Sequence, residues 1–227
     1  MPKRLWDYNG IRKLEIEPGL IAPATEYGWL HRGSIWLEGE STPHKVVVKQ
    51  FREETPMDNQ RVNHFETAVA KLKKAGAPVI AAKLHKHHDN GAERWVLITK
   101  LYEDARGKSA IRSYTELNLR NSTTRAKVLD VIAAMANAGY HPAKDCFGAV
   151  QTGKKLEFVL HSLDEFADCE RLESTPLDHK PSYEARVREI SKLSGVTPRE
   201  VIAELLARIT HNKARQALEE IKQKNKW

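Results

Sequence analysis

The sequence predicts an α+β protein in which strands dominate the N-terminal half and helices dominate the C-terminal half. Two observations predict this class. The run Val46–Phe51 is short and β-branched, as is typical of a strand, and the last third of the chain contains three segments with helical spacing of apolar residues. The composition agrees, because 41% of the 227 residues are hydrophobic and 30% are charged, as in a soluble globular protein.

The N-terminal half contains mostly strand patterns around one helix. Short strands are expected at Leu14–Ile16 and on either side of Gly28–Gly33, before the strand at Val46–Phe51. A helix follows, since apolar residues recur at spacings of three, four and three, namely Val62, Phe65, Val69 and Leu72. Asp58 or Asn59 is its expected N-cap, and Gly76 follows its end. A hairpin of Val79–Leu84 and Trp95–Leu101 is expected next.

The C-terminal half is expected to be mainly helical. Helices are predicted at Ser109–Leu119 and Thr124–Ala138, then a hairpin around Thr152-Gly153-Lys154, and a linker at Leu177–Ser182. Three further helices are predicted at about Glu184–Leu193, Pro198–Ile209 and Asn212–Gln223. The second of them has a strong start, because Thr197-Pro198-Arg199-Glu200 fits a capping box with proline at the first helical position. We expect a strand-rich lobe at residues 1–101 and a mainly helical lobe at 102–227 with a helical tail at 183–227.

Several classes of protein are excluded or disfavoured. The longest apolar runs, such as Val131–Ala136, have about six residues, whereas a membrane span needs about 20. No signal-peptide pattern is present at the N-terminus, and the two cysteines, Cys146 and Cys169, suit free thiols. We therefore expect a cytoplasmic protein without a membrane span. The net charge of +7 leaves a polyanionic partner open.

One lysine is expected to be buried. Lys49 shares a strand face with Val47 and Phe51, and a buried ammonium group needs a partner because its desolvation costs several kcal/mol. Glu66 is the best candidate, since it lies beside the apolar stripe of the following helix. The alternative is that Lys49 extends to solvent at the strand end and that Glu66 faces water.

The order of these elements resembles the protein-kinase-like fold across about residues 14–166. A glycine-containing turn, a strand ending Val-Val-Val-Lys, a helix with an internal glutamate, a hairpin, a long helix and a second hairpin occur in that order. Lys49 resembles the lysine that holds the α- and β-phosphates of ATP in this fold, and Glu66 resembles its helical partner. The resemblance implies a two-lobed fold with a reduced C-terminal lobe. In its nucleotide site, Lys49 contacts ATP and Glu66 orients Lys49, whereas an aspartate after the second hairpin binds Mg²⁺.

The catalytic segment departs from the pattern of active kinases. When His141 is aligned with the first residue of the motif H-R-D-L-x-x-x-N, the catalytic aspartate becomes Ala143 and the metal-binding asparagine becomes Gly148. After the second hairpin, the metal-binding aspartate becomes His161. The first interpretation is therefore a degenerate, pseudokinase-like chain, in which the charge on a transferring phosphoryl group is poorly neutralised.

The second interpretation is an active atypical small kinase. Here Asp145 is the catalytic base through a two-residue insertion, and Asp164 is the Mg²⁺ ligand through a three-residue shift. The segment Gly28–Gly33 argues against close phosphate binding, because it has only two glycines with bulky side chains between them.

The C-terminal tail offers a hypothesis of another class. Residues 190–201 resemble a helix-turn-helix, in which the start of the second helix enters the major groove of DNA. Arg199 is the expected base-reading residue, and residues 184–227 carry ten Lys and Arg against six Asp and Glu. Nucleic acid is thus a partner to test beside a protein partner or a nucleotide. The function predicted first is a non-catalytic kinase-like binding or regulatory module, in which Lys49 and Glu66 remain as a structural ion pair or as a remnant nucleotide contact.

Overall fold

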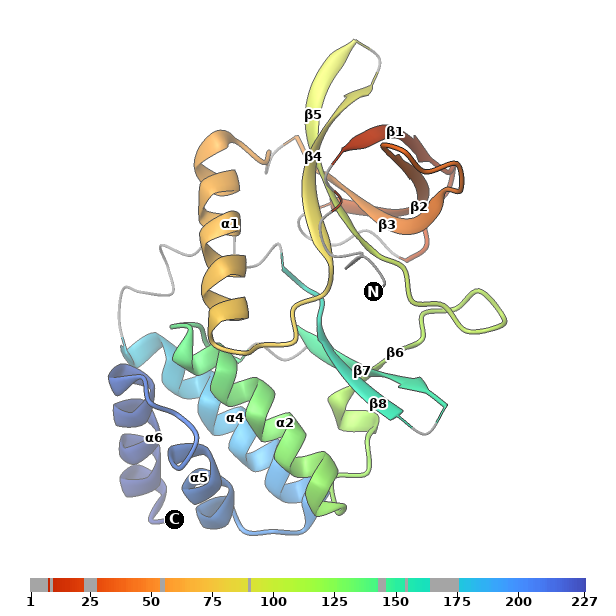
Figure 1. Cartoon of the computed structure of the whole chain (residues 1–227). Coiled ribbons are helices and arrows are strands. Elements are labelled where there is room, and N and C mark those ends of the chain that lie inside the picture. The colour runs from red at the N-terminus through yellow and green to blue at the C-terminus, as the bar shows by residue number, and fades with distance from the viewer. Residues whose placement is uncertain are drawn as a thin grey trace. The chain divides into compact units, whose positions relative to one another are not determined.

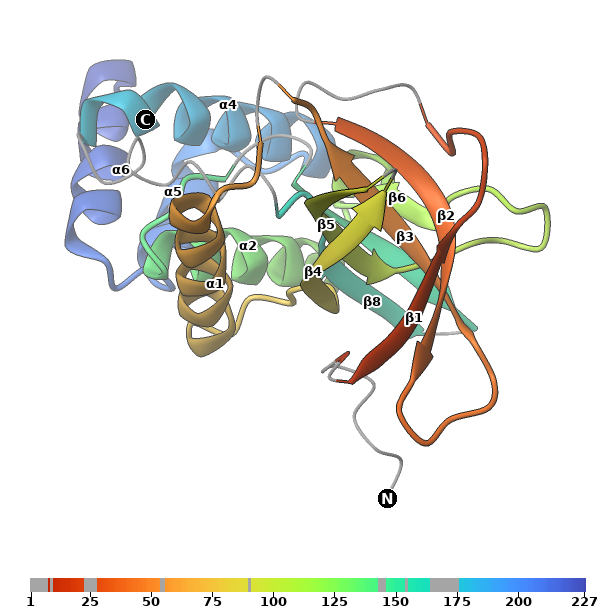
Figure 2. The same cartoon turned by 90° about the horizontal axis from the view of Figure 1, so that it is seen from above.

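The computed structural model describes residues 8, 10–22, 28–53, 56–89, 91–142, 146–153, 155–163 and 176–227. Its first half forms a curled, five-stranded antiparallel sheet in the order β1-β2-β3-β5-β4 (Figures 1 and 2). The strands are β1 (Ile11–Ile16), β2 (Gly28–Leu37), β3 (His44–Phe51), β4 (Ala82–Asp89) and β5 (Ala92–Lys100).

Alternation along β3 decides which face of the sheet forms the core. Val46 and Val48 are fully buried and pack in a cluster with residues of the neighbouring strands, namely Ile35, Leu37, Val96 and Ile98. Because successive side chains of a strand point to opposite faces, Val47 and Lys49 lie on the other face of the sheet. The predicted strand is therefore confirmed, and Lys49 is placed away from this core.

Helix α1 (Asn59–Lys74) follows β3 and begins as predicted. The carboxylate of Asp58 accepts a hydrogen bond of 2.8 Å from the backbone N–H of Arg61, which makes Asp58 the N-cap. Phe65 and Leu72 are buried on the predicted stripe, and Gly76 follows the helix with a φ of +82°. A left-handed residue at this place is the usual way to end a helix.

The second half contains a small sheet and a group of helices. The strands β6 (Ile111–Ser113), β7 (Phe147–Thr152) and β8 (Lys155–Leu160) pair in the order β6-β7-β8. The helices are α2 (Ser122–Asn137), α4 (Pro176–Ser194), α5 (Pro198–Leu206) and α6 (Asn212–Asn225), and a 3₁₀ helix, η1, spans Tyr114–Glu116. The long helix, the second hairpin and the capping box of Thr197 and Glu200 are as predicted.

Two sequence predictions for the second half of the chain are wrong. The helix expected at Ser109–Leu119 is β6 followed by η1, because residues 111–113 pair with β7 and Ser113 then caps the short helix. The linker expected at Leu177–Ser182 belongs to α4, which begins at Pro176. Proline suits the first turn of a helix, where its missing N–H has no partner to lose, and Pro176 stands at this position.

Contacts divide the chain into two compact units. The first unit contains residues 1–63 and 80–109, and the second contains residues 64–79 and 110–227. The α+β class is confirmed, with the large sheet in the first unit and most of the helical residues in the second. The expected lobe boundary at residue 101 stays a prediction. Within the described ranges, no helix is both long and apolar enough to cross a membrane.

Three tyrosines are expected to make the fold sensitive to alkaline pH. Burial, and then the charge of Tyr102, raises the pKa of Tyr8 to about 12, and burial also raises the pKa values of Tyr114 and Tyr183. Each folded pKa lies above the unfolded value near 10. The contribution of the three neutral phenols to the free energy of unfolding is therefore complete below about pH 10 and is lost as the pH rises further.

The free energy of unfolding in urea is thus expected to be level between about pH 8 and 9.5 and to fall at about pH 10.5 and 11. An absorbance titration of the phenolates in the native protein checks the cause. If all six tyrosines ionise together near pH 10, the burial of these three phenols does not control the alkaline limit.

Candidate functional site

Lys49 lies on a strongly apolar part of the first unit. Only 6% of its surface is exposed, and its cross-strand neighbours are Leu30 of β2 and Leu97 of β5. The sequence prediction of a buried lysine at this strand end is therefore correct. Burial of an ammonium group is costly without polar partners, so the groups around Lys49 hold its side chain in place.

Glu66 lies on an exposed turn of α1, next to the buried Phe65. It belongs to the second unit, whereas Lys49 belongs to the first. The ion pair between Lys49 and Glu66 stays a prediction, as does the use of either side chain for nucleotide binding.

The two glycines of the expected glycine-containing turn belong to β2. A Cβ atom at Gly28 would stand 2.0 Å from the carbonyl oxygen of Gln50, and one at Gly33 would stand 2.8 Å from that of Glu15. Both glycines therefore permit close approach of neighbouring strands in the curled sheet. The prediction that Gly28–Gly33 is a glycine turn is wrong, since these residues pair with β3 along their whole length.

Arg32 occupies the face of the sheet that carries Lys49. Its cross-strand partner on β3 is Val47, and Val47 in turn pairs with Thr99 of β5, so the three residues lie side by side. The Arg32 guanidinium donates hydrogen bonds of 2.6 Å to the carboxylate of Glu103 and to the carbonyl oxygen of Gly107. A charged side chain is thus held beside Val47 by the segment that follows β5.

This segment is itself held in a tight turn by Asp104. The Asp104 carboxylate accepts backbone hydrogen bonds of 2.8 Å from Arg106 and 3.0 Å from Lys108. Hydrogen bonds from the Lys108 and then the Arg106 backbone lower the pKa of Asp104. The carboxylate therefore stays ionised at neutral pH and fixes the carbonyl oxygen of Gly107 where Arg32 binds it. Sequence reasoning missed this site, because Arg32 and Glu103 are 71 residues apart.

In the second unit, Gly148 stands inside the ladder between β6 and β7, opposite Ser113. A Cβ atom there would lie 2.4 Å from the carbonyl oxygen of Arg112 and 2.8 Å from a methyl carbon of Ile111. His161 comes directly after β8, and its backbone N–H donates a hydrogen bond of 2.8 Å to the carbonyl oxygen of Cys146. The first interpretation of the sequence aligns these two positions with the metal-binding residues of the kinase pattern, and that alignment stays a prediction.

The remaining candidates of the catalytic segment lie outside the described residues. These are Ala143, Asp145 and Asp164. The choice between the degenerate and the active interpretation at these positions stays a prediction. Among the residues that the structure describes, no three side chains of His, Cys, Asp and Glu gather in a group that suits a metal ion.

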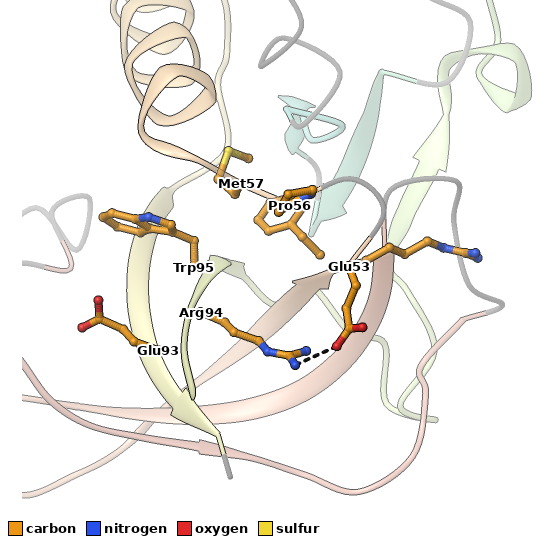
Figure 3. A pocket seen from close by; sticks show the side chains of 8 residues that line it. Glu53, Pro56, Met57, Glu93, Arg94 and Trp95 are labelled. Carbon is orange, nitrogen blue, oxygen red and sulfur yellow. Dashed lines mark hydrogen bonds and ion pairs between the residues drawn. The ribbon is translucent and has the colours of Figure 1, made fainter. Parts of the chain in front are cut away.

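A pocket of about 280 Å³ lies at another place in the first unit, and no predicted site residue lines it (Figure 3). Its apolar part includes Phe51, Met57 and Trp95, and its rim carries charged side chains. Arg94 and Glu53 pair across this rim at 2.8 Å. The charges therefore largely neutralise one another and select no class of ligand.

The C-terminal helices place Arg199 on an exposed turn at the start of α5. The neighbouring Glu200 carboxylate accepts a hydrogen bond of 2.8 Å from the backbone N–H of Thr197, so an acidic group lies at this helix start. Arg208, just after α5, forms an ion pair of 2.9 Å with Asp130 of α2. The buried residues of α5 are Val201, Ile202 and Leu205. Major-groove binding through Arg199 stays a prediction.

The elements of the structure follow one another in the order that the resemblance requires. This order is β1 to β3, the helix α1, the hairpin of β4 and β5, the long helix α2, and the hairpin of β7 and β8. The fold is protein-kinase-like. No family model matches the sequence, and no curated protein matches it.

Similar solved structures include PAN3 pseudokinases of low sequence identity. The pseudokinase of Neurospora crassa PAN3 is 11% identical with a TM-score of 0.47, and the alignment covers 97% of this chain and 59% of that chain. The Drosophila melanogaster PAN3 pseudokinase is 12% identical with a TM-score of 0.48, and the shares are 97% and 62%. A complex of Neurospora crassa PAN2 with PAN3 has 11% identity, a TM-score of 0.48 and shares of 97% and 59%. This chain thus spans about three fifths of the length of those chains.

Proposed function

We propose that this chain is a non-catalytic kinase-like module that acts by binding a protein partner. The proposal rests on Gly148 and His161, the residues that the direct alignment with the kinase pattern puts at the metal-binding positions. Mg²⁺ prefers oxygen ligands in near-octahedral geometry. Gly148 has no side chain and the carbonyl oxygen of Arg112 leaves no room for one, while His161 offers ring nitrogens. These residues do not fit Mg²⁺ bound to ATP.

The ion pair of Arg32 supports the same proposal from the first unit. A nucleotide base binds to flat apolar surface with a few placed polar groups. On the face of Lys49, the neighbouring surface of Val47 and Thr99 is shared with Arg32, which is held by Glu103 and Gly107. A base that bound here would have to displace the Arg32 guanidinium from Glu103 and Gly107. The loss of these hydrogen bonds would offset the free energy gained by binding the base, so weak or absent ATP binding is expected. Lys49 then has a structural role in the sheet.

A thermal-shift titration tests the proposal. ATP, with and without Mg²⁺, is expected to leave the melting temperature unchanged, whereas a ligand at 100 times its Kd would stabilise the protein by about 2.7 kcal/mol. An active protein kinase titrated in parallel shows that the nucleotide and the metal are competent. Incubation with labelled ATP and a general phosphoacceptor is expected to give no phosphate transfer.

The competing function is an active small kinase that uses Lys49, Glu66, Asp145 and Asp164. It requires a Mg²⁺-dependent shift together with phosphate transfer, and it requires both to be lost in Lys49→Ala and in Asp164→Asn. That set of results would overturn the proposed function. A shift without transfer would retain the non-catalytic part of the proposal and add nucleotide binding to it.

A further inference from the structure

Strand β4 carries two histidines on one face of the large sheet. His85 and His87 are two residues apart in the strand, so their side chains leave the backbone on the same side, about 7 Å from each other. Burial, and then the charge of His87, lowers the pKa of His85, which shows that the two rings lie close enough to interact. Neutral imidazole is the form that binds metal ions, and two such rings can converge on one ion at about 2.0–2.1 Å.

The ring nitrogens of His85 and His87 are not used by the residues that the structure describes. Within those residues, no hydrogen bond or ion pair engages either ring, whereas the ring of His44 binds the carboxylate of Glu40 at 2.6 Å. Both side chains are partly exposed, so a hydrated ion can reach them. Each ring therefore offers a nitrogen lone pair to a ligand from solvent.

Two cations on the same face limit which ions this pair of histidines can bind. Arg94 of β5 stands opposite His87, but its guanidinium pairs with Glu53 at 2.8 Å and is largely neutralised. Lys83 precedes His85 by two residues, and its charge contributes, after burial and His87, to the lowered pKa of His85. Ca²⁺ and Mg²⁺ need several oxygen ligands, which this face lacks among the described side chains. Ions that prefer imidazole nitrogen are left.

We propose that His85 and His87 bind one divalent transition-metal ion of the class that prefers imidazole, which comprises Ni²⁺, Cu²⁺ and Zn²⁺. Each histidine supplies one ring nitrogen, and water fills the remaining coordination positions. Because only two protein ligands are present, the ion exchanges readily and chelators remove it. His88 takes no part, since it lies on the other face, 3.7 Å from the carboxylate of Glu93. This site goes beyond the proposed function and does not depend on it.

Titration of the untagged protein with Ni²⁺, followed by calorimetry, tests the site. We expect one ion per chain, and we expect His85→Ala and His87→Ala each to weaken binding at least about tenfold. His88→Ala removes a histidine from the same strand but from the opposite face, and it is the matched control. It is expected to change the affinity by less than about twofold. Lys83→Gln is expected to tighten binding about twofold, because it removes a like charge from beside the ion.

Nuclear magnetic resonance of the unaltered chain locates the ion independently of any variant. Ni²⁺ is paramagnetic and broadens the signals of nearby nuclei, so the ring signals of His85 and His87 are expected to disappear first among those of the ten histidines. This readout decides the question even if a variant fails to fold.

Three outcomes would overturn the inference. Equal weakening by His88→Ala and His87→Ala would show that the ion does not select one face of β4. Broadening that begins at other histidines would place the ion elsewhere on the chain. An affinity as high in the double variant His85→Ala with His87→Ala as in the unaltered chain would reject both ligands.

Discussion

Replacing Gly148 with asparagine is expected to unfold or strongly weaken the second unit rather than to restore a metal site. The substitution supplies the asparagine that the sequence alignment with the kinase pattern predicts at this position. However, a Cβ atom would meet the carbonyl oxygen of Arg112 at 2.4 Å and a methyl carbon of Ile111 at 2.8 Å. The carbonyl belongs to the ladder of β6 and β7 and is not free to move. We expect the free energy of unfolding to fall by about 3 kcal/mol or more, because overpacking here displaces backbone.

Gly153→Asn is the matched control, since it makes the same substitution in the turn between β7 and β8. Gly153 has a φ of +59°, and no atom lies within 4 Å of the Cβ that it would gain. Asparagine tolerates this left-handed conformation better than most residues, so a change below about 1 kcal/mol is expected. Urea unfolding followed by circular dichroism measures both variants. Equal losses of stability, or Mg²⁺-dependent ATP binding by Gly148→Asn, would contradict the close approach at Gly148.

Local signals in the sequence were sufficient for most elements of the fold. The apolar spacing of α1 and the Asp58 cap, the long helix α2 and the capping box of α5 each depend on residues within one or two turns. The segment at Ser109–Leu119 was predicted wrongly because its strand is only three residues long and is defined by its pairing with β7. A strand of that length has too few residues for alternation to be distinguished from helical spacing.

The site was less accessible to prediction, because its decisive features are contacts between distant segments. The spacing of Gly28 and Gly33 does not distinguish a phosphate-binding turn from a strand that permits close approach of its neighbours. The distinction follows only from the register with β3. The burial of Lys49 was predictable from alternation within its own strand, whereas the neighbouring Arg32 is held by residues that follow β5. The residues next to Arg32 in the sequence give no indication of its ion pair with Glu103.

The second large effect is expected at Arg186, which connects three elements of the second unit. The Arg186 side chain in α4 donates hydrogen bonds of 2.5 Å to the Tyr114 hydroxyl and 2.7 Å to the Glu189 carboxylate. Tyr114 also donates to Glu189, and its ring stacks on Phe147 of β7 with centroids 4.7 Å apart. Arg186 is only 7% exposed. The guanidinium therefore holds η1 and β7 to α4 through one buried polar group.

Arg186→Ala leaves the Glu189 carboxylate and the Tyr114 hydroxyl without their shared donor. Removing one partner of a buried ion pair costs about 3–5 kcal/mol, but a quarter of the Glu189 side chain is exposed and water screens part of this loss. We expect the free energy of unfolding to fall by about 2–3 kcal/mol. Arg188→Ala, two residues along the same helix, is the control and is expected to cost about 1 kcal/mol or less, because the ion pair of Arg188 with Glu184 leaves the arginine 55% exposed.

A double variant separates two effects of Arg186→Ala, which are the loss of a buried contact and the loss of the positive partner of the Glu189 carboxylate. Arg186→Met with Glu189→Leu removes both charges and keeps much of the side-chain volume, so it is expected to be more stable than Arg186→Ala alone. Urea unfolding of the three variants gives the comparison. If Arg186→Ala is no more harmful than Arg188→Ala, the buried network does not hold η1 to α4. If the double variant is the least stable, the hydrogen bonds of Arg186 to Tyr114 and Glu189 contribute more than the desolvation of their charges costs.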